Sequence, residues 1–336
     1  MSRYAAAHVN PQGPGDARPT ALQIVKDEGL IGKLTDKVIL ITGGNSGIGL
    51  ETAKVLHATG ATIYITARTS EKLEKAIDEI KSWPEAESAA PVYGIELQLD
   101  SFASVRAAAK AFLEKDEKLN ILILNAGVMA TPEGRTEDGF ETQFGTNHLG
   151  HFLFFQLLKP ALVAASTPSF QSRVVSLSSK AHRMGGVRFD DFNFEKEPYH
   201  PWLAYGQSKT ANIYFATELE RRYGSQGVHG FSVHPGSIFT NLARHIDMSQ
   251  FDFKGELGLY LKNTGQGAAT TVYAALSKDL EGRGGIYLGD CGEEPPVKPG
   301  VDVGATSSAP GYAPWIYDQE AEARLWEESL KLVGIE

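Results

Sequence analysis

The part of the chain that most constrains its fold is a short apolar run followed at once by a cluster of glycines. Val38–Thr42 has the apolar, β-branched composition of a strand that is covered on both faces. It leads into the glycine-rich run Thr42–Gly49, after which 47–59 has helical character. Glycines let a backbone turn tightly and approach a pyrophosphate, whose charge the positive end of the following helix favours. The layout therefore predicts a phosphate-binding turn, made by Gly43, Asn45, Ser46, Gly47, Ile48 and Gly49.

The spacing of these glycines is Gly-x-x-x-Gly-x-Gly, which differs from the Gly-x-Gly-x-x-Gly of the commoner dinucleotide-binding turn. The alternative is a glycine-rich turn that holds no ligand. A strand and a helix flank the glycines as a binding turn requires, which favours the phosphate site.

Strand-like and helix-like segments alternate along the rest of the chain. Further strands are expected at Thr62–Thr66, Val92–Leu99, Ile121–Leu124, Arg173–Ser178, Val228–His234 and Gly285–Leu288. Further helices are expected over 70–82, 101–116, 137–165 and 204–223. This alternation predicts an α/β fold, a Rossmann-type doubly wound parallel sheet in a single domain. Ligands of such sheets bind beyond the carboxyl ends of the strands.

The two ends of the chain differ in composition from the central part, 37–290, which is expected to form the dinucleotide-binding domain with its catalytic site. Residues 1–36 are expected to form an N-terminal arm, because prolines and glycines in 1–20 resist regular structure. Residues 291–336 are expected to form a C-terminal extension packed on the domain. Its helical part offers apolar side chains for that packing, namely Trp315, Ile316, Leu325, Trp326 and Leu330.

Charge and cysteine content exclude several classes of function. The chain has 32 Lys and Arg against 41 Asp and Glu, and its net charge of -9 opposes general binding to nucleic acid. A single cysteine, Cys291, excludes an intrachain disulfide and a zinc site built on several thiolates. The most apolar stretch, Phe152–Ala165, is interrupted by polar residues and a proline, so no membrane span is expected. The first residues lack the apolar run of a secretory signal, and a cytoplasmic location is expected.

The end of the second predicted strand bears on which dinucleotide binds. NAD-specific sites place an acidic residue there, about 20 residues beyond the glycines, to hold the ribose 2′-hydroxyl. In this chain Ala67 takes that place and Arg68 follows it. A guanidinium suits a 2′-phosphate, so NADP is the expected cofactor and NAD the less favoured one. The alternative is a solvated surface arginine at the start of a helix.

Tyr205 and Lys209 form a pair whose chemistry fits proton transfer. Their spacing places both side chains on one face of the helix expected there. A free tyrosine has a pKa of about 10 and is a poor base at neutral pH unless a nearby ammonium stabilises its phenolate. Such pairs arise by chance on many helices. Two predicted strands upstream, however, end in Ser178-Ser179 and in Asn125-Ala126-Gly127, at the sheet edge where ligands bind.

The chain resembles the short-chain dehydrogenase/reductase family in motifs that follow one another in the family's order. They are the run Thr42–Gly49, Asn125-Ala126-Gly127, Asn147, Ser179, Tyr205 with Lys209, and His234-Pro235-Gly236. No motif is specific alone, but together they are, and the resemblance covers about residues 37–290.

The resemblance implies a role for each matching residue. Tyr205 would be the proton donor or acceptor, and Ser179 would orient the substrate oxygen, with Ser178 as a rival for that role. Lys209 would bind the nicotinamide ribose and lower the pKa of the tyrosine, and Asn147 would support a water relay to Lys209. Further cofactor contacts are implied at Asp100, Asn125, Ala126, Gly127, Pro235, Gly236 and Thr240.

The segment between Ser179 and Tyr205 is much longer than in the commonest members of the family. This segment, Asn147–Phe152 and Ser232–Gly236 resemble the retinol-dehydrogenase-like branch. Retinoid activity does not follow, because many members of that branch use other substrates.

Two segments are expected to border the substrate pocket, because the topology puts both at the carboxyl edge of the sheet. One is the aromatic loop 183–203, and the other follows Gly236 and contains Ile238, Phe239, Leu242, Phe251, Phe253, Leu257 and Leu259. The alternative is that these aromatics seal the core or a subunit contact. The expected pocket residues are Met129, Ser179, Trp202, Tyr205 and Phe239.

The expected function is NADP(H)-dependent interconversion of an alcohol and a ketone or aldehyde on a largely apolar small molecule. Tyr205 would handle the proton and no metal is required. His148 and His151 are spaced like half of a metal site, but no further ligand set accompanies them, and helix packing explains them better.

Two alternatives stay open. One is a catalytically idle NADP(H)-sensing or scaffold protein, against which the intact set Ser179, Tyr205 and Lys209 counts. The other is an epimerase or dehydratase acting on nucleotide-sugars, whose usual Gly-x-x-Gly-x-x-Gly is absent at Gly43–Gly49. The sequence leaves open the substrate, the direction of the reaction and whether the chain forms a homo-oligomer.

Overall fold

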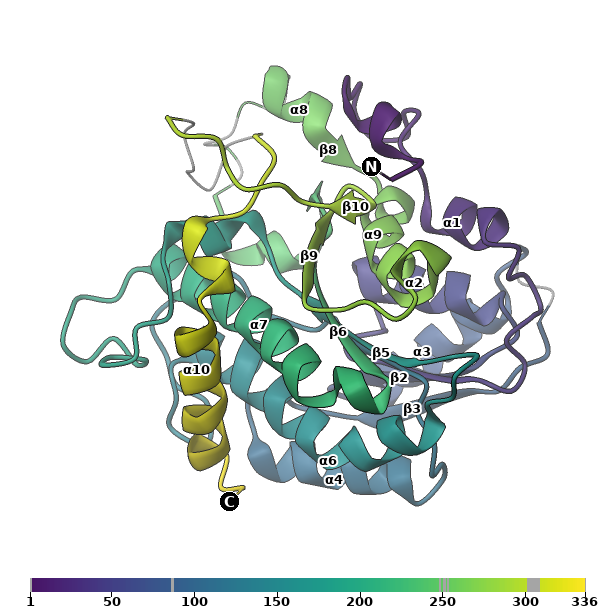
Figure 1. Ribbon diagram of the computed structural model, residues 1–336, viewed down its shortest axis with the longest axis horizontal. Coiled ribbons are helices and arrows are strands. Elements are labelled where there is room, and N and C mark those ends of the chain that lie inside the picture. The colour runs from purple at the N-terminus through teal and green to yellow at the C-terminus, as the bar shows by residue number, and fades with distance from the viewer. Residues whose placement is uncertain are drawn as a thin grey trace.

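A mostly parallel sheet forms the centre of the computed structural model (Figure 1). The structure describes residues 2–85, 88–247, 249, 252, 254–300 and 309–335. Within these residues eight strands form one sheet in the order β10-β9-β6-β5-β4-β1-β2-β3, and only β9 and β10 pair antiparallel. The strands are β1 (Val38–Ile41), β2 (Thr62–Ala67), β3 (Val92–Glu96), β4 (Ile121–Leu124), β5 (Ser172–Leu177), β6 (Val228–His234), β9 (Ile286–Gly289) and β10 (Gly292–Glu293). A separate two-stranded pair consists of β7 (Ser237–Ile238) and β8 (Leu261–Lys262).

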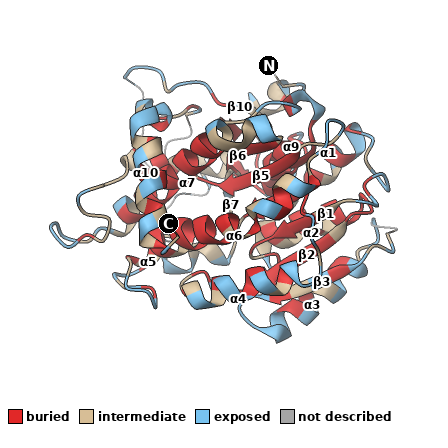
Figure 2. Cartoon of the chain, turned by 60° about the horizontal axis from the view of Figure 1, so that its bottom comes forward, coloured by how far each residue is buried: buried red, intermediate tan, exposed pale blue. Residues whose placement is uncertain are grey.

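Helices cover both faces of the sheet, and each face has its own apolar core. Ile39 and Ile41 of β1 belong to the core that α1, α2, α3 and α9 cover, whereas Leu40 belongs to the core under α4, α6, α7 and α10. This alternation is the two-residue period of a strand that is buried on both faces. Figure 2 shows the strands and the inner helices mostly buried, with the exposed positions on the outer faces of the helices. The helices are α1 (Ala21–Asp27), α2 (Gly47–His57), α3 (Ser70–Lys81), α4 (Phe102–Leu113), α5 (Thr142–Phe144), α6 (Gly150–Ala165), α7 (Pro201–Tyr223), α8 (Glu256–Tyr260), α9 (Thr264–Leu276) and α10 (Gln319–Leu332).

The predicted α/β class and doubly wound sheet are confirmed, and each of the seven predicted strands is present with small shifts at its ends. The expectation of one helix over 137–165 is wrong. The carboxylate of Glu141 accepts hydrogen bonds from the backbone N–H groups of Gln143 and Phe144, so the helix begins at Thr142. A π-type turn, Gly145–Leu149, then separates α5 from α6.

Helix α9 is a large element that the sequence analysis missed. Its start is well defined, because Asn263 and Gln266 exchange side-chain-to-backbone hydrogen bonds in a capping box. Glycine, alanine and threonine make up most of the helix, and Gln266–Leu276 is buried throughout. A helix that is buried all round shows no apolar stripe, so the periodicity used to recognise helices is absent.

Both ends of the chain pack against the domain. In the C-terminal extension, the ring of Trp326 on α10 stacks on Phe215 of α7 at a centroid distance of 5.9 Å and meets the edge of Phe152 of α6 at 5.1 Å. Before α1, the N-terminal arm has little regular structure apart from the 3-10 turn Ala5–His8. It is nevertheless packed, since Tyr4 is buried and meets Tyr273 of α9 edge-on at 6.2 Å. Among the helices that the structure describes, none has both the length and the apolar character needed to span a bilayer.

Candidate active site

One large cavity, of about 1150 Å³, lies at the carboxyl ends of the parallel strands. Sites for a single small molecule typically measure ~300–1,000 Å³, so this cavity has room for a dinucleotide together with a second small molecule. Of the site residues predicted from the sequence, all line the cavity except Asn147. The topology therefore brings together motifs that are spread over almost 200 residues of sequence.

The glycine loop between β1 and α2 has the shape of a phosphate cradle. Gly47 has a φ of +54°, a conformation that side chains disfavour. A Cβ atom at Gly49 would lie 2.3 Å from the carbonyl oxygen of Gly43, so no larger residue fits there. In the described chain the side chain of Ser46 accepts no hydrogen bond from the first turn of α2. The N-terminus of α2 is thus left uncapped at the wall of the cavity, which suits the pyrophosphate of a dinucleotide.

A buried network around Thr42 holds this loop against the turn after β4. The hydroxyl oxygen of Thr42 accepts hydrogen bonds from the N–H groups of Asn125 (2.9 Å) and Ala126 (3.0 Å). The same hydroxyl lies 2.9 Å from Nε2 of His151, whose Nδ1 lies 3.0 Å from the carbonyl oxygen of Asn147. Because that carbonyl can only accept, Nδ1 of His151 carries the proton and Nε2 accepts from Thr42. One buried imidazole therefore links the glycine loop to the π-type turn.

Ser179, Tyr205 and Lys209 all line the cavity. Ser179 follows β5, and its side chain interacts with the phenol of Tyr205, near the start of α7. The ammonium nitrogen of Lys209 lies 5.5 Å from the centre of the Tyr205 ring and donates to the carbonyl oxygen of Leu177 at 3.0 Å. Ser178 is directed elsewhere, since its hydroxyl donates to the backbone carbonyl of Lys209 at 2.8 Å. Of the two serines, Ser179 is therefore the one placed to act with the tyrosine.

Burial determines the protonation states of Tyr205 and Lys209. It raises the pKa of Tyr205 well above its usual value, and the hydrogen bond with Ser179 opposes the rise only in part. It also lowers the pKa of Lys209 to about 7. The side chains alone thus do not produce the lowered tyrosine pKa that the family resemblance implies. The reason is that desolvation of the phenolate is the largest influence on the pKa of Tyr205. The phenol holds its proton at neutral pH and is ready to donate it.

Asn147 lies behind the cavity wall, in the π-type turn. Its amide exchanges hydrogen bonds of 2.9 Å with both the N–H and the C=O of Val128, and its Nδ2 also donates to Ser208 at 3.0 Å. The side chain therefore clamps the segment after Gly127, which lines the cavity. Its predicted part in a water relay stays a prediction.

Two basic side chains flank the end of β2. Arg68 is exposed and follows Ala67 directly, as predicted, and Lys72, in the first turn of α3, also lines the cavity. Lys72 was not among the predicted site residues, although its position four residues after Arg68 in a helical segment was a signal for it. A phosphate on the ribose would lie within a positive field here, so the residues present fit NADP.

The segment after Gly236 and the loop 183–203 differ in how far they reach the cavity. Ile238, Phe239, Leu242 and Leu257 line the cavity, whereas Phe251 and Phe253 lie outside the described residues. In the loop 183–203, Trp202 lines the cavity and meets Tyr205 edge-on at 6.1 Å. The other aromatics of this loop pack away from it.

Two contacts show where those loop aromatics go. Phe192 stacks on Phe144 of α5 at 4.9 Å, and the hydroxyl of Tyr199 donates to the carbonyl of Thr131 at 3.0 Å. For these side chains the alternative that they seal the core is the correct one, because α5 offers them an apolar surface nearer than the cavity.

Several polar residues of the cavity wall were missed from the sequence. His8, Lys180, Lys262 and Asp290 line the cavity, together with His234 of the predicted His-Pro-Gly motif. No local pattern marks them, because the arm, the turn after β5, β8 and the end of β9 meet only in the folded chain.

Comparison with known proteins places the chain among related sequences and structures. A family model described as short chain dehydrogenase matches residues 37–250. Short-chain dehydrogenase/reductase prx1 of Penicillium roqueforti is 47% identical over 336 residues, which covers 99% of this chain and 95% of that protein. Retinol dehydrogenase 12 of Mus musculus is 39% identical over 304 residues, covering 90% of this chain and 88% of that protein.

Solved structures share the fold. A crystal structure of a protein from Mycobacterium Paratuberculosis has a TM-score of 0.66 at 35% identity and covers 89% of this chain and 94% of that one. The Pseudomonas aeruginosa RhlG/NADP active-site complex has a TM-score of 0.62 at 23% identity, covering 77% of this chain and 96% of that one. At that level of identity the second likeness shows the fold alone.

Proposed function

This chain belongs to the short-chain dehydrogenase family, and from that premise we propose that it is an NADP(H)-dependent oxidoreductase that interconverts an alcohol and a ketone or aldehyde on a largely apolar small molecule. The observation that carries the proposal is that Ser179, Tyr205 and Lys209 line the same cavity as the glycine loop, with the ammonium of Lys209 5.5 Å from the centre of the Tyr205 ring.

Each of these side chains has a task in the proposed reaction. The bound nicotinamide supplies or takes up the hydride. In reduction, the hydroxyls of Tyr205 and Ser179 donate hydrogen bonds to the carbonyl oxygen and polarise it. The phenol of Tyr205 then gives its proton to the oxygen on which negative charge develops. Its raised pKa supports this direction, because it keeps the phenol protonated at neutral pH.

Lys209 lies beside Tyr205, where its charge can affect the proton transfer. Lys209 lines the cavity, where it would bind the ribose of the dinucleotide. Its ammonium lies 5.5 Å from the centre of the Tyr205 ring and donates to the carbonyl of Leu177 at the end of β5. A pKa of about 7 means that its charge changes within the physiological range. The rate should therefore depend on pH near neutrality.

The preference for NADP rests on Arg68 and Lys72, and the apolar character of the substrate rests on Trp202, Phe239 and Leu257. One related protein is named a short-chain dehydrogenase/reductase and another a retinol dehydrogenase, which supports a carbonyl or alcohol substrate without specifying it. The intact Ser179, Tyr205 and Lys209 set counts against an idle NADP(H)-sensing role.

A screen of hydrophobic ketones, aldehydes and alcohols with NADPH and NADP, followed by nicotinamide absorbance, tests the activity. Ser179→Ala and Ser178→Ala form a matched pair of variants. We expect Ser179→Ala to lower kcat by roughly 10²-fold or more, the loss typical of a removed oxyanion donor. Ser178→Ala should mainly reduce stability, because its hydroxyl bonds to helix backbone. Equal losses of kcat in the two variants, or no turnover of any substrate in the unmodified protein, would contradict the proposal.

A further inference from the structure

The N-terminal arm reaches the same cavity as the catalytic side chains. Ala5, His8, Val9, Pro11 and Arg18 all line it. Figure 1 shows this purple segment beside α8 and β8, which belong to the segment after Gly236. The arm precedes the matched family region, which begins at residue 37.

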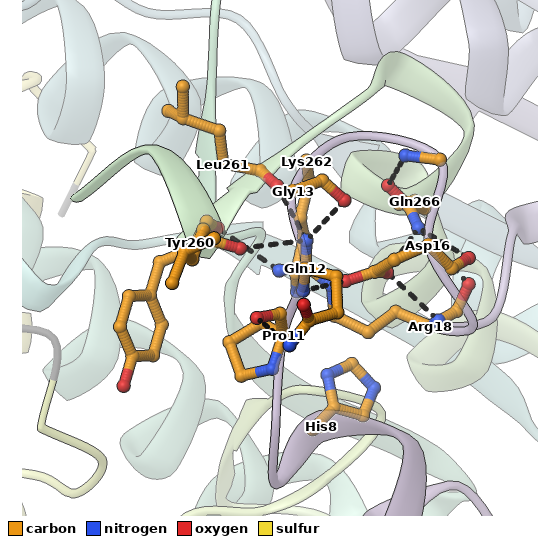
Figure 3. Close-up of polar contacts among 12 residues, drawn as sticks. His8, Pro11, Gln12, Gly13, Asp16, Arg18, Tyr260, Leu261, Lys262 and Gln266 are labelled. Atoms are coloured by element: carbon orange, nitrogen blue, oxygen red, sulfur yellow. Dashed lines mark hydrogen bonds and ion pairs between the residues drawn. The ribbon is translucent and has the colours of Figure 1, made fainter. Parts of the chain in front are cut away.

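A buried arginine holds the arm against the segment 259–261. The Arg18 side chain donates to the backbone carbonyls of Tyr260 (3.1 Å) and Leu261 (2.6 Å), and to that of Gly13 within the arm (3.0 Å). The N–H of Gly13 in turn donates to the carbonyl of Leu259 at 2.9 Å. Figure 3 shows these contacts converging on the guanidinium. Only 3% of the Arg18 side chain is exposed, so it works as a rigid clamp rather than as a solvated charge.

A second set of hydrogen bonds holds the side chain of Arg18 and the arm in place. The carboxylate of Asp16 accepts from Nε of Arg18 at 2.8 Å and from Nε2 of Gln266 at 2.9 Å. The other amide atom of Gln266, Oε1, accepts from the N–H of Gly15 at 2.9 Å. The arm is therefore anchored to the first turn of α9, in the buried layer of the domain.

The start of the arm is tied to the sheet. Nδ1 of His8 lies 3.2 Å from the carboxylate of Asp290, which follows β9. The same carboxylate accepts from the buried ammonium of Lys262 at 2.7 Å, and Lys262 also reaches the carbonyl of Pro235 at 3.4 Å. The arm thus lies against Asp290, whose ion pair with Lys262 leads to the turn after β6 that borders the expected nicotinamide site.

Between the attachment at His8 and the one formed by Gly13 and Arg18, the arm exposes the apolar side chain of Val9. Val9 is 70% exposed and Phe239 is 51% exposed, and in the described chain these are the two most exposed large apolar residues. Both line the cavity. Apolar side chains held open to water on the wall of a cavity gain free energy when an apolar ligand covers them.

We infer that the arm forms one wall of the substrate pocket and selects for carbonyl or alcohol substrates with a bulky apolar skeleton. This inference rests on the proposed function. Small carbonyl compounds would reach Tyr205 without contacting the arm, whereas bulky ones would cover Val9. Mutations in the arm would then change the preference for substrate size without changing the catalytic residues Ser179, Tyr205 and Lys209.

A matched pair of exposed residues tests this. Val9→Asp places a charge on the cavity wall, and Ile31→Asp places the same charge at an exposed apolar position, 42% exposed, in the segment between α1 and β1. Neither side chain is buried, so neither variant should fail to fold. The measurements are kcat/KM for a bulky apolar ketone and for a small aldehyde, the Kd of NADPH, and Tm.

We expect Val9→Asp to lower kcat/KM for the bulky ketone by about tenfold or more, the range that a changed apolar contact gives in a hydrophobic pocket. The values for the small aldehyde and for NADPH should stay within about twofold, and Ile31→Asp should match the unmodified protein throughout. Arg18→Lys, which keeps the charge but loses the planar fork, should change the ratio of the two substrates in the same direction.

Equal kcat/KM for the bulky ketone in Val9→Asp and Ile31→Asp would overturn the inference while leaving the proposed function intact. So would an equal loss for both substrates in Val9→Asp. If the unmodified protein turned over neither substrate with either cofactor, the proposed function would fail, and this inference with it.

Discussion

Replacing Arg68 by Ala should remove most of the preference for NADPH over NADH. Arg68 stands at the carboxyl end of β2, directly after Ala67, where an acidic residue would favour NAD. It lines the cavity together with Lys72. A guanidinium can give two parallel hydrogen bonds to a 2′-phosphate, and this phosphate is what distinguishes the two cofactors.

The size of the effect follows from the exposure of Arg68. A hydrogen bond to a charged group contributes about 1.5–3 kcal/mol, or roughly 10–150-fold in Kd. Arg68 is exposed, so water and salt screen it, and the lower end of that range applies. We expect about a tenfold rise in the Kd of NADPH at ~0.1 M salt, growing as salt is reduced. Lys72→Ala should cost less, because an ammonium acts as a point charge without the fork.

The assay is a titration of NADPH and NADH by calorimetry at two salt concentrations. The Kd of NADH should be unchanged in Arg68→Ala. Lys81→Ala, at the exposed end of α3 and away from the cavity wall, controls for a change in net charge. Equal Kd values for the two cofactors in the unmodified protein would refute the reasoning, and so would equal weakening of both by Arg68→Ala.

The other predictions concern chemistry, substrate size and stability. Tyr205→Phe should lower kcat by roughly 10²–10⁴-fold with the Kd of NADPH unchanged, because the ring stays and only the transferable proton is lost; near-normal turnover would disprove the mechanism. Trp202→Ala should reduce kcat/KM for a bulky apolar substrate more than for a small one, and a uniform loss would assign the ring to structure. Trp326→Ala should lower the free energy of unfolding by about 3–5 kcal/mol in denaturant titrations, because the buried ring leaves a cavity between α6, α7 and α10; a loss under about 1 kcal/mol would contradict that packing. Burial lowers the pKa of both His148 and His151 to about 3, so between about pH 6.5 and 3 the unfolded chain binds the extra protons. The free energy of unfolding should then fall with acidification by up to about 1.4 kcal/mol per pH unit for each histidine, and a flat profile over this window would be inconsistent with buried neutral rings.

The parts of the site that were predictable are those that short sequence motifs specify. The glycine loop, the Asn-Ala-Gly turn after β4 and the Ser179 turn after β5 each directly follow an apolar strand. A parallel sheet brings the ends of its strands to one edge, so knowing the strands was enough to bring these turns together. The same rule placed Tyr205, because α7 begins at that edge.

The parts that could not be predicted depend on contacts between distant segments. Helix α9 has no apolar stripe because every side of it is buried, and its burial comes from α1, α2 and the sheet. The aromatics Phe192 and Tyr199 suit a substrate pocket and a core surface equally well by composition. Only the position of α5 shows that they pack on it. The raised pKa of Tyr205 likewise follows from complete desolvation, which no sequence spacing expresses.

The catalytic motifs and the N-terminal arm lie in different parts of the chain, and this separation affects substrate specificity. The side chains proposed to carry out the chemistry lie at the end of β5 and in the first turns of α7, within the region that the family model matches. The wall contributed by Val9 and the Arg18 clamp lies outside that region and depends on backbone carbonyls of 259–261, which any sequence supplies. An arm held in this way can change its exposed side chains without disturbing the hydrogen bonds that hold it. Substrate selection can therefore vary among related chains while the geometry of Ser179, Tyr205 and Lys209 stays constant. Exchanging residues 4–12 with those of a relative should alter the preferred substrate size but not the pH dependence of kcat.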